Sequence, residues 1–190
     1  HDPDYVARFH DNELDASALR RMGLPWSEAL VKLTTRAVGG SLLTAELALQ
    51  HGLACHLAGG THHAHRDFAS GFCIFNDLAI ISLSLLASDT VQSILIIDCD
   101  VHQGDGTAAL TAGREDVFTL SLHAEKNFPV RKARSSLDVA LPDDFAAIPD
   151  SHRVILNAGL TKSLARQYAD HRDRLSDRLR AMIEEGLSYD

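Results

Sequence analysis

A run of apolar, mostly β-branched residues at positions 93–97 ends directly at a segment crowded with acidic and imidazole side chains, residues 98–107. Such a run predicts a strand buried on both faces, and strands of that kind belong to parallel sheets. Residues 117–122 and 154–156 are predicted to form two more buried strands. Ligands of parallel sheets bind beyond the carboxyl ends of the strands, so the polar segment after Ile97 is the first candidate for a functional site.

Helical patterns alternate with these strands. Ser27 is predicted to cap a helix over residues 28–50 that ends at Gly52, with Gly39 and Gly40 marking close packing in its middle. Helices are also expected over residues 72–87 and 107–112 and beyond residue 160, and a short strand over 53–58. Residues 20–26 and 124–144 are expected to be irregular. The alternation predicts an α/β fold, a three-layer parallel sheet flanked by helices.

Size and charge narrow the classes of function. The chain has 190 residues, which suits one domain. Its net charge of −8 argues against direct binding of nucleic acid, but it leaves room for a basic substrate such as a lysine-bearing tail. The three cysteines have no CxxC spacing, which indicates reduced thiols and a cytoplasmic protein. We see neither a membrane span nor a signal peptide in the sequence.

The segment Asp100-Val101-His102 places a carboxylate and an imidazole just past the end of a predicted strand. Both are good ligands for zinc, iron or manganese. The alternative is that Asp100 caps the next helix and His102 is an ordinary loop histidine. Asp98 and Asp105 flank the pair in a glycine-rich loop, and this favours a metal site.

The adjacent histidines His62 and His63 form the second candidate group. Neighbouring loop histidines point apart, so they suit a general base and an electrostatic helper beside a metal-bound water better than a shared metal. Each would need a carboxylate on its far nitrogen, and Asp98 and Asp105 are available for that role. The alternative is two ordinary polar loop residues.

Phe72 and Phe128 lie in predicted loops. They are either core aromatics or the apolar walls of a substrate channel.

Several motifs in the right order resemble the histone deacetylase family of the arginase/deacetylase superfamily. They are residues 59–63, 70–77, 98–107, 121–123 and 127–129. The run 123–129, together with residues 131–132 and 136–139, is most similar to the class IV and bacterial members. The resemblance is strongest over residues 1–141. It implies that the whole chain, residues 1–190, is a single deacetylase-like domain.

The resemblance implies an arginase-like fold and zinc-dependent hydrolysis of an acetyl-lysine or related amide. In that family pattern Asp100 and His102 would bind zinc, and His62 and His63 would be the tandem catalytic histidines, with Asp98 and Asp105 as their partners. The resemblance also implies that Gly71, Phe72 and Phe128 contact the acyl-lysine, and that Asp98, Ser121 and Leu122 lie around a structural potassium ion.

The chain departs from the family pattern at two functional positions. Thr161 stands where the family has its third metal ligand, an aspartate, and Asp170 is a displaced candidate for that role. The Gly-Gly-Tyr motif that supplies the family's catalytic tyrosine is absent, because the chain's tyrosines are Tyr5, Tyr168 and Tyr189. A first strand ahead of His1 and a continuation beyond Asp190 are also missing relative to the family, so we expect a truncated, incomplete fold.

Two hypotheses follow from the sequence. The first is a deacetylase that acts on an acetylated protein or a small acylated amine. The second is a catalytically impaired remnant that acts as a binding module. Missing strands also predict unpaired sheet edges and self-association.

Overall fold

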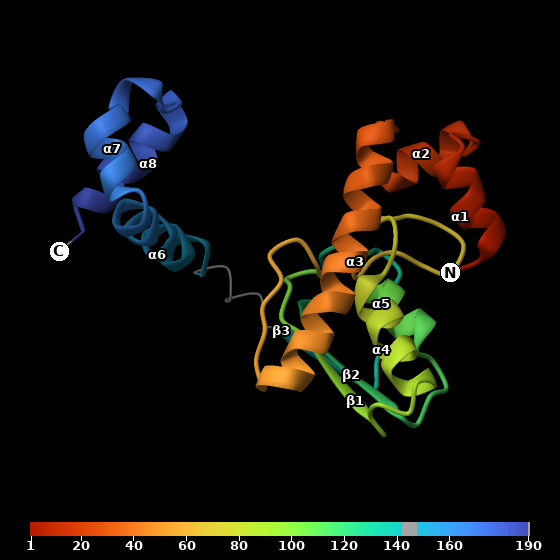
Figure 1. Ribbon diagram of the computed structural model, residues 1–190. Coiled ribbons are helices and arrows are strands. Elements are labelled where there is room, and N and C mark those ends of the chain that lie inside the picture. Colours follow the sequence, from red (N-terminus) through yellow and green to blue (C-terminus); the bar gives the residue numbers. More distant parts are fainter. Residues whose placement is uncertain (142–147, 190) are drawn as a thin grey trace. The chain divides into compact units, whose positions relative to one another are not determined.

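The computed structural model describes residues 1–141 and 148–189 (Figure 1). The chain divides into two compact units, His1–Leu141 and Pro142–Asp190. The single domain over residues 1–190 stays a prediction. Nearly all the predicted site residues belong to the first unit.

Two short helices and the loop that carries Ile74 form the hydrophobic core at the start of the first unit. Helix α1 (Pro3–His10) begins at the cap residue Asp2, whose side chain accepts a hydrogen bond from the Asp4 backbone. Helix α2 (Ala16–Met22) ends at Gly23, which has a left-handed backbone with φ of 81°. The prediction that residues 20–26 are irregular is therefore wrong for residues 20–22, which are helical. The buried core residues are Tyr5, Phe9, Leu14, Met22, Ala69 and Ile74.

Helix α3 (Glu28–His51) confirms the predicted long helix, with Ser27 as its cap and Gly52 at its end. Gly40 marks close packing, because a Cβ atom there would lie 2.6 Å from the ring of His56. His56 in turn bonds the Ala37 carbonyl through Nε2 at 3.1 Å. Residues 53–58 therefore fold back along α3 as irregular chain, and the strand predicted there is not formed.

In the part of the chain that the structure describes, three parallel strands make the sheet, in the order β1 (Ile94–Asp98), β2 (Val117–Ala124) and β3 (Leu137–Leu141). Helix α5 (Asp105–Leu110) connects β1 to β2, so the predicted α/β class and the short helix are confirmed. Strand β3 falls inside the stretch predicted to be a loop. Asp138 interrupts its apolar pattern, and its carboxylate is bonded by Gln103 Nε2 at 2.7 Å.

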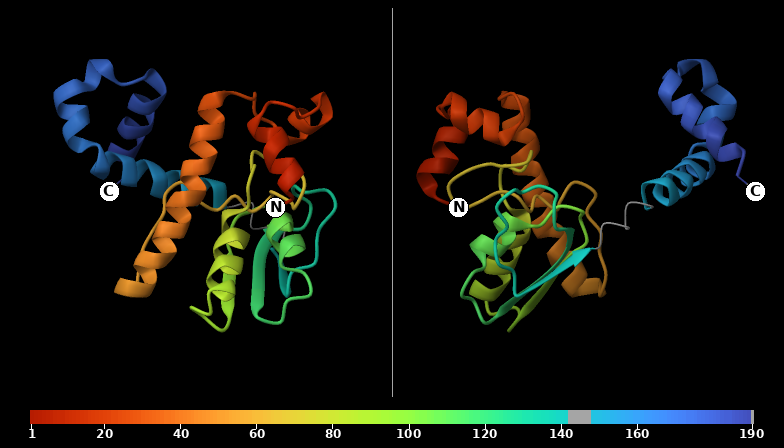
Figure 2. Two further views of the ribbon diagram at one scale, coloured as in Figure 1. Left: turned by 45° about the vertical axis from the view of Figure 1, so that its right-hand side comes forward. Right: turned by 180° about the vertical axis from the view of Figure 1, so that it is seen from behind.

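One face of the sheet is covered and the other is exposed. Helices α4 (Asp77–Ala87) and α5 lie on the same side of the strands (Figure 2). Ile96, Val117 and Thr119 are buried, whereas Leu95 is 60% exposed and Ile97 is 56% exposed. The prediction that residues 93–97 are buried on both faces is wrong, because Leu95 and Ile97 are exposed and no layer of the first unit, His1–Leu141, covers their face of the sheet.

Helix α4 begins five residues later than predicted, at Asp77 rather than at residue 72. Asn76 caps it by accepting a hydrogen bond from the Ala79 backbone at 2.9 Å. Phe72 has a positive φ of 66°, which no α-helix contains, so the segment before Asn76 is a loop.

The second unit is helical. It contains α6 (Ile148–Ser163), α7 (Ala165–His171), the 3-10 turn η2 (Arg172–Arg174) and α8 (Asp177–Leu187). Helix α6 packs closely against α8, since a Cβ on Gly186 would lie 2.2 Å from the Asn157 carbonyl oxygen. The helical prediction beyond residue 160 is confirmed, but the strand predicted at 154–156 is wrong, because those residues lie within α6.

Candidate active site

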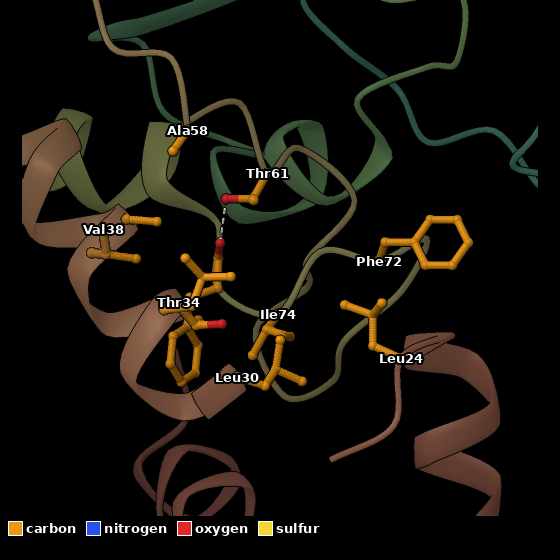
Figure 3. Close-up of a pocket in the computed structure, with 11 residues that line it drawn as sticks. Leu24, Leu30, Thr34, Val38, Ala58, Thr61, Phe72 and Ile74 are labelled. Carbon is orange, nitrogen blue, oxygen red and sulfur yellow. Dashed lines mark hydrogen bonds between the residues drawn. The ribbon is translucent and has the colours of Figure 1, made fainter. Parts of the chain in front are cut away.

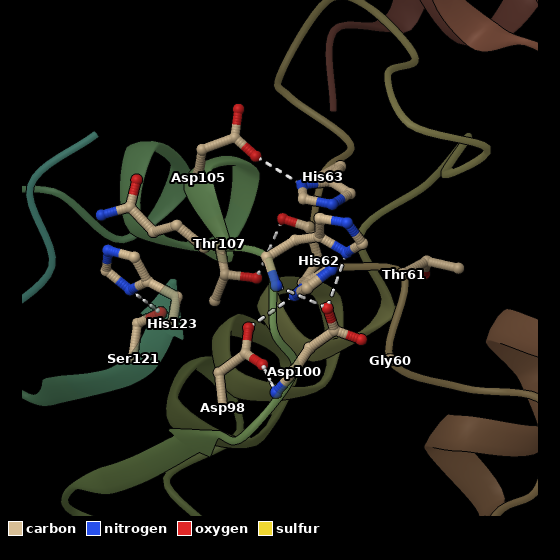
Figure 4. A network of polar contacts seen from close by, with 12 residues as sticks. Gly60, Thr61, His62, His63, Asp98, Asp100, Asp105, Thr107, Ser121 and His123 are labelled. Carbon is tan, nitrogen blue, oxygen red and sulfur yellow. Dashed lines mark hydrogen bonds and ion pairs between the residues drawn. The ribbon is translucent and has the colours of Figure 1, made fainter. Parts of the chain in front are cut away.

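Two histidine–aspartate pairs lie side by side at the carboxyl end of β1, with His62, His63 and Asp105 buried and Asp98 half-buried (Figure 4). His62 Nδ1 lies 2.5 Å from Asp98 Oδ2, and His63 Nδ1 lies 2.6 Å from Asp105 Oδ1. Asp98 is the last residue of β1 and Asp105 the first of α5. The neutral tautomer that fits such a bond carries its proton on Nδ1 and leaves a lone pair on Nε2. Each imidazole is therefore arranged to accept a proton.

Hydrogen bonds between the carboxylates and the imidazoles shift the pKa values of His62 and Asp105. Burial alone would lower the pKa of His62, but its hydrogen bond to Asp98 and the nearby acidic charges outweigh burial and raise the pKa above the ordinary value. Burial would raise the pKa of Asp105, yet hydrogen bonds from His63 and His65 lower it to about 2. Asp105 is thus a permanent anion at neutral pH.

Helix α5 and Asn76 fix the backbone that carries the tandem histidines. The Thr107 amide donates to the His62 carbonyl at 3.0 Å. Asn76 Nδ2 donates to the Ala64 carbonyl at 3.2 Å. A Cβ on Gly106 would lie 2.3 Å from the Ala64 oxygen, so only glycine lets α5 approach this closely.

Asp77 fixes the residues just before the histidines. Its carboxylate accepts hydrogen bonds from the Gly60 amide at 3.0 Å and the Thr61 amide at 2.8 Å. Ser41 Oγ on α3 donates to the same group at 2.7 Å. The turn that presents His62 and His63 is therefore tied to both α3 and α4.

Asp100 and His102 face each other at the opening of the site. Asp100 Oδ1 lies 2.9 Å from His102 Nδ1, and both side chains are partly exposed. Two donors on one tetrahedral zinc ion stand about 3.3 Å apart, so this carboxylate and imidazole need to separate only slightly to hold one. Within residues 1–141 and 148–189, no group of three or more His, Cys, Asp or Glu side chains could hold a metal ion. The pair fits part of a zinc site.

Phe128 and Gly71 lie against His63. The Phe128 ring meets the His63 ring edge-on, with centroids 4.8 Å apart. A Cβ on Gly71 would lie 2.6 Å from His63 Cδ2 and 3.0 Å from the Phe128 ring. Phe128 thus forms an apolar wall beside the histidines, and the backbone of Gly71 lies against both the Phe128 and the His63 rings.

Phe72 lies apart from this wall. Its ring packs on Gly23, where an added Cβ would lie 2.8 Å from it. It lines a mostly apolar cavity of about 180 Å³ with Leu24, Leu30 and Ile74 (Figure 3). Its predicted role as the second wall of the substrate channel stays a prediction.

The residues predicted around a potassium ion meet across two strands. Asp98 and Ser121 are direct partners in the register of β1 and β2, and Leu122 follows on β2. Ser121 Oγ contacts His123 Nδ1 at 3.0 Å.

The two candidates for a third metal ligand lie in the second unit. Thr161 is in α6, and its hydroxyl donates to the Asn157 and Ile183 carbonyls at 2.8 and 3.0 Å. Asp170 is in α7, where its carboxylate lies 3.6 Å from Arg166 Nε.

Sequence reasoning gave no role to several residues that shape the site. Asn76 could have been found from its position before an apolar helical run, which is a helix-start signal. His65, which bonds Asp105, and Gln103, which bonds Asp138, make contacts between segments far apart in the chain. No local pattern marks such contacts.

Comparison with known proteins identifies the class. The family model of the histone deacetylase domain matches residues 1–167. The chain belongs to the histone deacetylase family.

Proteins similar to this chain include two curated relatives and one solved structure, as follows. An uncharacterized protein of Picosynechococcus sp. (strain ATCC 27264 / PCC 7002 / PR-6) is 54% identical over 143 residues, covering 75% of this chain and 48% of the relative. The acetoin utilization protein AcuC of Staphylococcus aureus (strain COL) is 45% identical over 93 residues, covering 48% of this chain and 24% of AcuC. The crystal structure of an HDAC homolog complexed with SAHA has 26% sequence identity and a TM-score of 0.63, covering 90% of this chain and 50% of that chain. The chain therefore spans half or less of the length of these proteins.

Proposed function

We propose that this chain carries the tandem-histidine half of a zinc-dependent deacetylase centre that hydrolyses an acetyl-lysine or related acyl-amide. The two His–Asp pairs carry this proposal, because a carboxylate that holds an imidazole in one tautomer prepares it to act as a general base. Their position beside Asp100, His102 and Phe128 supports it further.

Each residue of the site has a separate role in the proposed reaction. Asp100 and His102 would hold zinc, which supplies Lewis-acid polarisation of water and of the amide carbonyl when bound. Nε2 of a tandem histidine takes the proton of the attacking water as the new C–O bond forms. A protonated histidine returns a proton to the amine nitrogen as the C–N bond breaks. Asp98 and Asp105 hold the Nδ1 protons throughout.

Substrate and setting are part of the same proposal. Phe128 offers an apolar wall to a lysine-like alkyl chain, Gly71 lies against it, and Phe72 would form the second wall. The substrate is an acetylated protein or a small acylated amine, and a structural potassium ion would stabilise the Asp98–Ser121 region. We place the protein in the cytoplasm, in line with three free thiols. No helix of the described residues is long and apolar enough to cross a membrane.

The test combines metal content with turnover. The purified full chain is loaded with zinc, dialysed, and assayed with a fluorogenic acetyl-lysine peptide. If the chain is an active enzyme, it should retain zinc near one ion per chain, and His63→Ala should lower kcat by about 10²–10⁴-fold. His10→Ala is the matched control, since His10 is an exposed histidine of α1. Failure to retain zinc at neutral pH would show that this polypeptide alone is not an active enzyme.

The second candidate function is a catalytically impaired remnant that binds a ligand or partner. It is favoured by the lack of a three-residue ligand group in the part of the chain that the structure describes. No tyrosine of the chain follows a Gly-Gly pair: Tyr5 is buried and donates to the Ile74 carbonyl, and Tyr168 and Tyr189 belong to the second unit. Titration with the same acetylated peptide separates the two functions, because a remnant would bind without turnover.

A further inference from the structure

Asp105 serves two histidines rather than one. Its Oδ1 atom lies 2.6 Å from His63 Nδ1, and its Oδ2 atom lies 3.0 Å from His65 Nε2. The Asp105 side chain is 9% exposed and that of His65 is 19% exposed. The second bond is therefore shielded from water and joins an otherwise unassigned residue to the tandem pair.

The fold holds His65 in this position from its other side. The His65 amide donates to the Phe68 carbonyl at 3.0 Å, which closes a tight loop. Its ring stacks on the Phe68 ring, with centroids 4.3 Å apart and planes 17° from parallel. The guanidinium carbon of Arg21, on α2, lies 4.2 Å from the Phe68 centroid. His65 is thus fixed by packing that does not involve Asp105.

A carboxylate with a donor on only one oxygen can turn about its Cβ–Cγ bond. Asp105 is the first residue of α5, so its backbone is fixed while its side chain keeps that rotation. A second donor on the second oxygen removes that freedom. This is how a partner behind a carboxylate can orient an imidazole that the partner never touches.

We propose that His65 is a positioning residue of the site, whose Nε2–H holds the second oxygen of Asp105 so that the first stays in line with Nδ1 of His63. The consequence for catalysis rests on the proposed function, whereas the hydrogen-bond geometry does not. His65 contacts neither Asp100 nor His102 in this arrangement and acts only through Asp105 and His63.

Two substitutions separate the hydrogen bond from the ring. In His65→Gln the amide nitrogen stands the same number of bonds from Cα as Nε2 of histidine, so it can donate to Asp105. In His65→Phe the ring can still stack on Phe68, but the donor is lost. His10→Phe makes the same chemical change at an exposed histidine of α1 and serves as the control.

The experiment is nuclear magnetic resonance of the full chain labelled with ¹⁵N-histidine. In the unsubstituted protein we expect His65 to carry a proton on Nε2 and the His63 Nδ1 proton to exchange slowly with water. His65→Phe should speed that exchange about tenfold or more, because it removes a hydrogen bond to a charged group. His65→Gln should restore slow exchange, and His10→Phe should leave it unchanged.

Each outcome decides the matter. A bare Nε2 on His65 in the unsubstituted protein, or unchanged His63 exchange in His65→Phe, overturns the proposal. The tautomer is read without any substitution, so a variant that fails to fold does not block the test. A lack of zinc binding or turnover would count against the proposed function only. If turnover is measurable, His65→Phe should lower kcat with little change in KM, and His65→Gln should recover it.

Discussion

Asp77 lies away from the proposed chemistry, but it determines where the tandem histidines begin. Its buried carboxylate accepts hydrogen bonds from the Ser41 hydroxyl and from the amides of Gly60 and Thr61. Burial would raise the pKa of Asp77, but these hydrogen bonds together outweigh burial and hold the pKa below its ordinary value. The stabilisation is therefore present above the unfolded pKa of about 3.9 and is lost as pH falls through the lower folded value.

Asp77→Asn should reveal this contribution. At pH 7 we expect a loss of about 2 kcal/mol in the free energy of unfolding, because a buried charged acceptor is replaced by an amide that matches fewer donors. Below about pH 4 the difference from the unsubstituted protein should shrink, since protonation of Asp77 removes the charge that the Asp77→Asn variant already lacks. Urea denaturation followed by fluorescence of Trp26, the only tryptophan and a residue of the first unit, measures it.

Asp89→Asn is the control for this prediction. Asp89 is exposed after α4 and has a positive φ of 53°, which asparagine tolerates well. Equal losses in the two variants would show that Asp77 has no special role.

At the scale of elements, the site depends on how closely α5 approaches the histidine loop. The contact is made at Gly106, where an added Cβ would meet the Ala64 carbonyl oxygen at 2.3 Å and the His62 oxygen at 2.7 Å. Backbone atoms on both sides leave no flexible side chain that could move aside. Moving α5 would also stretch the Thr107–His62 and Asp105–His63 hydrogen bonds.

Gly106→Ala is expected to destabilise the first unit by about 1–3 kcal/mol, the usual cost of overpacking a rigid site. Gly39→Ala is the matched control, because nothing lies within 4 Å of a Cβ at Gly39 in α3. That change should stabilise the protein by about 0.5–1 kcal/mol through helix propensity. Thermal unfolding monitored through Trp26 distinguishes the two signs, and a stabilised Gly106→Ala protein would contradict the close approach.

Elements with strong local signals could be predicted from the sequence. The long helix after Ser27 has a cap, a regular apolar pattern and a terminal glycine, and α3 forms as expected. Residues 154–156 carry an apolar run as well, yet they lie in α6, where packing against α8 determines the structure. Asp138 interrupts the apolar pattern of β3, so the sequence alone does not predict the strand. Its carboxylate is bonded by Gln103, which is far away in the chain, and this contact explains how the strand accommodates an acidic residue.

The site residues, like the helices and strands, could be predicted where the signal is local and could not where the contact joins distant segments. His62, His63, Asp98 and Asp105 could be placed together because they end a predicted strand or lie in glycine-rich loops beside it. Asp98 bonds His62 and Asp105 bonds His63. This pairing depends on the start of α5 at Asp105, which only the structure shows. His65 gave no signal at all, because its partner Asp105 is distant in sequence and its stacking partner Phe68 is an ordinary loop aromatic.

At the scale of the whole molecule, one face of the sheet in the first unit is apolar and exposed. Leu95 pairs with Phe118, and Leu120 pairs with Leu137, so side chains from all three strands line up on that face. Phe118 and Leu137 are each 48% exposed. Strands β1 and β3 are the edges of the sheet within the described residues. A contiguous apolar patch and open strand edges both favour association.

We expect the isolated chain to self-associate, with the sheet face of one copy against that of another, and a charge placed there should weaken the contact. Phe118→Lys or Leu95→Lys should move the sedimentation profile toward monomer, because each copy would bury an unpaired ammonium group in the apolar contact. Leu57→Lys makes the same change at a fully exposed loop leucine outside the sheet, and it should leave the profile unaltered. A wild-type chain that stays monomeric at its highest soluble concentration, or a Leu57→Lys effect equal to that of Phe118→Lys, would mean that the sheet face does not drive association.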